Sequence, residues 1–144
     1  MKKLLFLLFL LVNNEAIAEI TVQKYCAMVR DSAHTISYIK IGLKMREDSA
    51  AFLNTKPTED AVKIFQGNLN AYVKNMYEKD LANAYEADNK INQQYPNNKF
   101  PQFVVDQVVL QKLVLSNAFD NGGSEIANRE WVYNHCNQEI GKLK

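Results

Sequence analysis

The segment FVVDQVVLQKLVLSNAF, residues 103–119, is the most apolar stretch of the chain outside its N-terminus. Its apolar residues cover most of a helix circumference, a pattern typical of a helix buried in the middle of a bundle. Its β-branched residues would also permit a strand, but its length and its regularly placed polar residues favour a helix. The stretch therefore predicts an all-α fold with this segment at its centre.

The segments before it carry apolar residues three and four positions apart, as amphipathic helices do. A first helix starts near Val22, and we expect it to end at Gly42, because glycine readily forms the left-handed C-terminal cap of a helix. A short second helix covers about residues 44–53. It ends before Pro57, because the residue that precedes a proline avoids helical angles.

Two hydroxyl residues mark the starts of later helices. Thr58 predicts the N-cap of a segment that runs to Gln94, either as one long helix or as two helices joined near Asn75. Ser124 predicts the N-cap of a last helix over about residues 125–142, after a pair of glycines stops the preceding helix. The whole pattern predicts a single-domain, all-α bundle of four to five helices.

The N-terminus has the features of a secretory signal peptide. Two lysines are followed by the apolar run Leu4–Val12, and Ala16-Ile17-Ala18 is a small-x-small cleavage site. An uncleaved anchor is the weaker interpretation, because a membrane span needs roughly 20 apolar residues and this run is followed directly by polar ones. We expect residues 1–18 to be a signal peptide and residues 19–144 to form the helical domain, in the periplasm or outside the cell.

The chain has two cysteines, Cys26 and Cys136. In an oxidising compartment such a pair indicates a disulfide, which would staple the first helix to the last. Closing a loop of about 100 residues stabilises a fold by about 4–5 kcal/mol in the chain-entropy model. The alternatives are a reactive thiol assisted by His34 or His135 and a metal site that includes these histidines. Both are disfavoured, because neighbouring helix residues do not face each other and no metal-ligand spacing is present.

The charge balance limits the classes of partner. Without the predicted signal peptide the chain has 15 basic and 15 acidic side chains, a formal net charge of zero. Nucleic acids and anionic membrane surfaces both select concentrated positive charge. We therefore expect neither as a partner, and no cofactor or metal is predicted. Another protein is the expected partner, with a homodimer left open.

Two groups of side chains could form a functional site. The acidic residues of the middle segment, such as Glu78 and Asp80, could supply a glycosidase pair, but interleaved lysines favour a solvated helix face. The tyrosines on this segment fit core packing with their hydroxyls at the surface. The more specific hypothesis is a partner-binding surface, because tyrosine is enriched in interface hot spots, and the aromatic loop after the segment is a second candidate contact. The predicted contact residues are Tyr72, Tyr77, Tyr85, Tyr95, Phe100 and Phe103.

Three features of the sequence occur together. They are a signal peptide, a cysteine in the first mature helix, and a Tyr-x-x-Cys pattern in the last helix, Tyr133 to Cys136. In these features the chain resembles small exported helical proteins of Gram-negative bacteria and their prophages. It is similar in style to the type VI secretion amidase-immunity proteins. The resemblance implies a helical, exported protein that plugs a peptidoglycan amidase, and it carries over no individual contact residue.

Together these patterns predict a non-enzymatic periplasmic binding protein. The leading hypothesis is an immunity protein or an inhibitor of a cell-wall hydrolase, acting by steric blockage through the Tyr95–Phe103 loop or the tyrosine surface. The alternative is an envelope stress chaperone or a solute-binding protein with a groove between its helices.

Overall fold

The computed structural model describes residues 20–94, 96 and 103–141 of the chain. This part of the chain is helical and contains no strand, which confirms the predicted all-α bundle. The predicted signal peptide lies outside the described residues. The helices are α2 (Val22–Asp31), α3 (Ala33–Asn54), α4 (Glu59–Gln94), α5 (Phe103–Asn121) and α6 (Glu125–Gly141).

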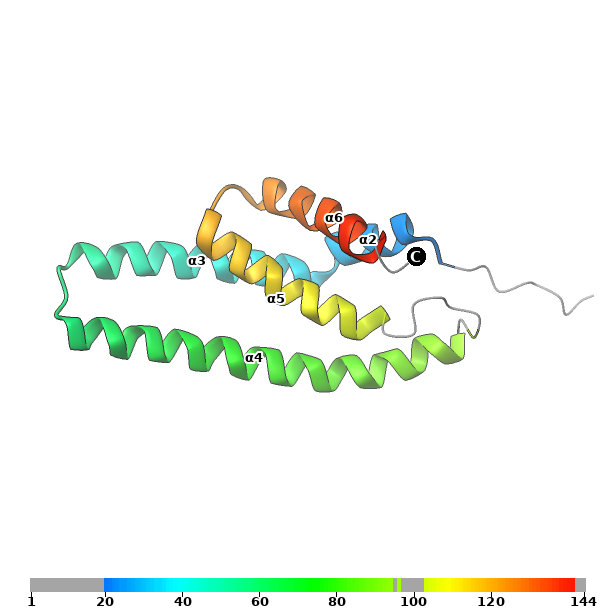
Figure 1. Ribbon diagram of the computed structural model, residues 1–144, viewed down its shortest axis with the longest axis horizontal. Helices are drawn as coiled ribbons and strands as arrows, with labels where there is room; N and C mark the ends of the chain where they lie inside the picture. Colours follow the sequence, from blue (N-terminus) through cyan, green and yellow to red (C-terminus); the bar gives the residue numbers. More distant parts are fainter. Residues whose placement is uncertain (1–19, 95, 97–102, 142–144) are drawn as a thin grey trace, which may run out of the picture.

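Helix α5 is the central element of the bundle. It packs against α3, α4 and α6, and Figure 1 shows α4 and α6 on opposite sides of it. Its buried face supplies Val108, Leu110, Val114 and Leu115 to the core, whereas Val109 and Leu113 stay exposed. The prediction from residues 103–119 is therefore confirmed for the helix and its central place, although one strip of it faces outward.

The long helices α3 and α4 run antiparallel as a hairpin that extends past the end of α5 (Figure 1). Helix α4 is one continuous helix, which settles the choice left open at Asn75. Thr58 caps its start, where the Ala61 backbone N–H donates to Thr58 Oγ1 at 3.3 Å, and Ser124 caps α6 through a 3.1 Å bond from the Ala127 N–H. No helix in the described part of the chain combines the length and the hydropathy of a membrane span.

The predicted boundary between the first two helices is wrong. The break lies at Ser32, whose extended backbone (ψ 143°) separates α2 from α3, and not at Gly42. Ser32 Oγ accepts a hydrogen bond from the Thr35 N–H at 3.1 Å and donates one to the Val29 carbonyl oxygen at 3.0 Å. One serine side chain therefore satisfies backbone groups at the end of one helix and the start of the next.

Gly42 lies in the interior of α3, where it faces α5. A Cβ atom on it would lie 2.7 Å from Ala118 Cβ and 2.8 Å from the Leu115 carbonyl oxygen. Both distances are shorter than van der Waals contact. The glycine therefore serves a close helix–helix approach, which overrides its poor propensity for a helix interior.

The predicted disulfide is present. Cys26 on α2 and Cys136 on α6 are bonded, with their Cα atoms 5.6 Å apart, and both are fully buried. Tyr25, Val29 and Val132 are buried with them, so the bond crosses a packed interface. The disulfide links residues 110 positions apart and holds α2 beside α6.

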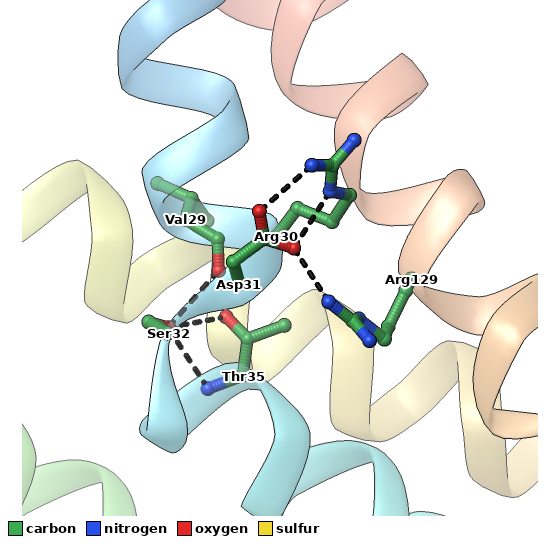
Figure 2. A network of polar contacts seen from close by, with 6 residues as sticks. All are labelled: Val29, Arg30, Asp31, Ser32, Thr35 and Arg129. Atoms are coloured by element: carbon green, nitrogen blue, oxygen red, sulfur yellow. Dashed lines mark hydrogen bonds and ion pairs between the residues drawn. The ribbon is translucent and has the colours of Figure 1, made fainter.

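A network of charged side chains joins α2 to α6 (Figure 2). The Asp31 carboxylate accepts hydrogen bonds from Arg30 at 2.8 and 2.7 Å, and from Arg129 on α6 at 2.6 Å. The bonds from Arg30, followed by that from Arg129, hold the pKa of Asp31 well below its usual value. This network and the disulfide both tie the short helix α2 to the C-terminal helix.

The contact at Gly42 predicts opposite effects for the same substitution at two glycines. Gly42→Ala is expected to lower the free energy of unfolding by about 1–3 kcal/mol, because α3 and α5 must move apart. Gly67→Ala is the matched control: its Cβ meets nothing within 4 Å, so better helix propensity should raise stability by about 1 kcal/mol. Urea unfolding followed by circular dichroism measures both, and a stabilised Gly42→Ala variant would contradict the close contact.

The Asp31 network predicts a pH-dependent contribution to stability. Asp31→Asn is expected to cost about 0.5–1 kcal/mol at pH 7, because the partly exposed ion pairs are screened by solvent. The lowered pKa means that the carboxylate stabilises the fold above its unfolded pKa near 3.8, and that this contribution fades as pH falls below that value. Urea unfolding between pH 2 and 7 should show the difference from wild type shrinking in acid. Glu78→Gln on exposed α4 surface is the control, and an Asp31→Asn difference that is constant with pH would contradict the prediction.

Candidate functional site

The face where α3, α4 and α5 meet carries a groove and a polar pocket. The groove, which we term the hairpin groove, has a volume of about 500 Å³. It lies between α5 and the half of the α3–α4 hairpin that is nearer the tip. Apolar side chains from the three helices make most of its wall. Its lining residues are Met45, Gln66, Leu69, Asn70, Val73, Lys112, Leu115, Ser116 and Phe119.

The groove runs beside the C-terminal half of α5, and the hairpin is longer than α5. In Figure 1, α3 and α4 continue beyond the point where α5 ends and the chain turns into α6. At the tip the two helices meet through Phe52 and Phe65, whose rings stack with centroids 4.4 Å apart. Leu53 and Ile64 beside this stack are 57% and 66% exposed. The hairpin thus presents apolar side chains that no third helix covers within the described part of the chain.

One charged side chain lines the hairpin groove. Lys112 on α5 places its Nζ atom 4.7 Å from the centroid of the Tyr77 ring, which holds the ammonium by a cation–π interaction. The other polar lining residues, Gln66, Asn70 and Ser116, are neutral. The groove therefore suits an apolar segment, with a preference for negative charge near Lys112.

The second cavity, which we term the polar pocket, has a volume of about 200 Å³. It lies between the first turn of α3, residues 80–87 of α4 and residues 107–111 of α5. Its most unusual wall residue is Gln111, which is only 2% exposed and whose Oε1 atom accepts no hydrogen bond. The pocket is lined by His34, Asp80, Asn83, Ala84, Ala87, Gln107, Val108 and Gln111.

Asp80 is held in place from α3. The Tyr38 hydroxyl donates a short hydrogen bond to Asp80 Oδ2, although the two residues are 42 positions apart. Burial, and then this bond, raise the pKa of Tyr38 well above its usual value, so the hydroxyl stays protonated and remains a donor. An adjoining cavity of about 360 Å³ shares His34 and Asp80 with the polar pocket and is lined further by Tyr72 and Lys79.

The predicted contact residues are placed in different surroundings. Tyr72 and Tyr85 are 47% and 59% exposed on α4, whereas Tyr77 is half-buried and packs against the core under Lys112. Tyr95 and Phe100 lie outside the described residues, and Phe103 begins α5. A role for these six residues in partner binding stays a prediction.

The expectation of a solvated acidic face on α4 holds for part of the set. Glu78 and Glu86 are exposed and pair with Lys74 and Lys90 one turn away. Asp80 is different, because it is half-buried and hydrogen-bonded to α3. Spacing along α4 could not separate these cases, because the partner that distinguishes Asp80 comes from another helix.

The sequence left two alternatives to a structural cysteine pair, a reactive thiol and a metal site. Cys136 has no free thiol, because it is bonded to Cys26, so it cannot act as a nucleophile in this state. The neighbouring His135 stacks on Trp131 with ring centroids 4.7 Å apart. Among the residues that the structure describes, no three histidine, cysteine or carboxylate side chains gather as metal ligands would.

Apart from His34 and Asp80, the sequence interpretation missed the residues that line the hairpin groove and the polar pocket. In the sequence, Gln111 is one of the polar residues that favour a helix over a strand in the most apolar segment. A polar residue at a buried position is itself a signal, because buried polar groups need a partner. Met45 and Phe119 carry no such signal, since apolar residues at helical spacing are the same in a groove as in a core.

Comparisons with protein-family models, with curated proteins and with solved structures find no match to this chain. The fold therefore defines the protein as an all-α bundle closed by one disulfide, and its function has to be argued from its own surface and cavities.

The bond between Tyr38 and Asp80 predicts a measurable coupling of α3 to α4. Tyr38→Phe removes the donor to a half-buried carboxylate and should lower the free energy of unfolding by about 1–3 kcal/mol. Tyr85→Phe, on an exposed stretch of the same hairpin, should change it by less than about 0.5 kcal/mol. Urea unfolding measures both values, and equal effects would contradict the predicted coupling.

Proposed function

We propose that this chain is an exported, non-catalytic binding protein that holds an apolar segment of another protein in the hairpin groove. The observation that carries the proposal is the groove itself, about 500 Å³ with largely apolar walls, between α5 and the α3–α4 hairpin. Protein-binding grooves of this kind accept the apolar face of a helix or loop. The proposed contact is therefore the hairpin groove, in place of the Tyr95–Phe103 loop predicted from the sequence.

Three features support a protein partner. The exposed apolar residues Leu53 and Ile64 lie near the tip of the same hairpin. Tyr72, 47% exposed on the same pair of helices, is a residue type that is enriched in binding hot spots. Lys112 supplies a positive charge at the wall, so an apolar segment with an acidic residue at one end is the complementary chemistry.

A more specific form of the proposal is an immunity protein or inhibitor of a cell-wall hydrolase in the periplasm. The disulfide and the Asp31 network hold the opposite end of the bundle together, so the scaffold that carries the hairpin is fixed before a partner binds. In this form the hairpin would occupy the partner's cleft. Hydrolase identity and periplasmic location both stay proposals.

Site-specific photo-crosslinking identifies the partner and tests the surface. A benzoylphenylalanine at Leu69, in the groove, is expected to crosslink one envelope protein of the native host, whereas the same probe at Glu86 on exposed α4 surface should not. If that protein is a cell-wall hydrolase, an equimolar amount of this chain should suppress its activity. A hydrolase that retains full activity in the complex would contradict the immunity form of the proposal.

Two substitutions at neighbouring positions test how much the groove contributes to the affinity for the partner. Leu69→Asp places a charge on the apolar wall and should weaken binding of the crosslinked partner by at least about 30-fold, as loss of a hot spot does. Asn68→Asp adds the same charge one position away, on an exposed site, and should change affinity by less than about threefold. Calorimetric titration measures both, after circular dichroism shows that both variants are folded. Equal affinities would rule out the hairpin groove as the contact.

A further inference from the structure

Gln111 is an anomaly in the core of the bundle. It is 2% exposed, yet its Oε1 atom accepts no hydrogen bond. Leaving a buried acceptor unpaired is costly, because the group loses its hydrogen bonds to water and gains none, and about nine in ten buried polar groups in proteins have a partner. Because Gln111 lines the polar pocket, a donor that enters this pocket can supply the missing bond.

The wall contributed by α4 determines the charge of that donor. Among the described residues, Asp80 is the one acidic side chain that lines the polar pocket, and no lysine or arginine of this part of the chain lines it. The Tyr38 hydroxyl bonds to Oδ2 of Asp80, so the carboxylate is oriented and its remaining lone pairs stay available as acceptors. The amides of Asn83 and Gln107 add further polar groups.

From this arrangement we propose that the polar pocket is a binding site for a small primary-amine cation. An ammonium group has three N–H donors and one positive charge, so it can bond to Asp80 on α4 and to Gln111 on α5 together. The volume of about 200 Å³ is below the range of about 300–1,000 Å³ that is usual for drug-sized ligands, so the ligand is a compound of few non-hydrogen atoms.

The site is selective for charge. An anion would meet the Asp80 carboxylate and the unpaired carbonyl oxygen of Gln111, which both repel it. A neutral alcohol could donate one hydrogen bond to Gln111 but would gain no charge interaction with Asp80. His34, exposed at the α3 wall, can bond to a hydroxyl or a second amine at the other end of the ligand.

This inference is independent of the proposed protein-binding function. The polar pocket and the hairpin groove share no lining residue, although α5 contributes to both. Loss of partner binding would therefore leave amine binding intact, and the reverse also holds.

Titration of the disulfide-bonded protein with defined probes tests the proposal. Ethanolamine and 1,3-diaminopropane are expected to give saturable shifts in amide NMR spectra, centred on Ala84, Ala87 and Val108 at the pocket wall. Ethylene glycol, which matches ethanolamine in size without its charge, should bind at least tenfold more weakly, and acetate should not bind there. The absence of saturable shifts with both amines, or equal binding of ethylene glycol, would overturn the proposal.

Two variants assign the binding to the named side chains. Asp80→Asn should weaken amine binding at least tenfold while it keeps an acceptor for Tyr38, and Glu78→Gln, the same change on exposed α4 surface, should leave binding unchanged. Gln111→Met has nearly the same shape and removes the Oε1 acceptor that lacks a partner, together with the rest of the amide, and circular dichroism should show that the variant is folded. Its amine affinity should nevertheless fall at least fivefold. A Gln111→Met variant that binds amines as wild type does would exclude Gln111 from the site.

Discussion

The close approach of α3 to α5 at Gly42 is the constraint on which the rest of the bundle depends. With hydrogen as its side chain, Gly42 lets α3 come so near that a Cβ there would lie 2.7 Å from Ala118. Helix α5 is thereby fixed in the middle, and α4 and α6 pack on its remaining sides (Figure 1). Both cavities described above are spaces between α5 and the hairpin, so their walls depend on this contact.

The two ends of the molecule are held in different ways. At one end the Cys26–Cys136 bond and the carboxylate of Asp31 join α2 to α6 by a covalent link and by charged hydrogen bonds. At the other end the tip of the α3–α4 hairpin is held by the stacked rings of Phe52 and Phe65, with exposed apolar neighbours. Elements with few buried contacts are the ones that open or rearrange most easily. The hairpin groove therefore lies where the fold can adapt to a partner, while the opposite end keeps the scaffold rigid.

Helix α5 also connects the two candidate sites. Gln111 lines the polar pocket and the next residue, Lys112, lines the hairpin groove. Adjacent helix positions point about 100° apart, so one stretch of α5 can face a cavity on each side. The charges differ accordingly: the polar pocket has a carboxylate at its wall and the groove has an ammonium. Each cavity thus favours a different kind of ligand, although both are formed by the same three helices.

Much of the fold follows from local sequence. Helical periodicity, the caps at Thr58 and Ser124, and the cysteine pair predicted the all-α bundle and its disulfide, because these signals depend on residues within a few positions of each other or on the compartment. The boundary at Ser32 has a local signal, since serine is a strong N-cap, but Gly42 ten residues later gives a competing stop signal. Glycine allows either a cap or a close contact, and only the facing residues Leu115 and Ala118 decide between them.

The sites were decided by tertiary structure. Asp80 looks like any acidic residue of a solvated helix until packing brings the Tyr38 hydroxyl from α3 to it. Gln111 looks like a helix-surface residue until packing buries it without a partner. By itself the sequence determined which segments are helical and which cysteines pair. The assembled bundle determined which polar groups are buried and where cavities remain, because burial and cavity shape arise from contacts between helices that are distant in the chain.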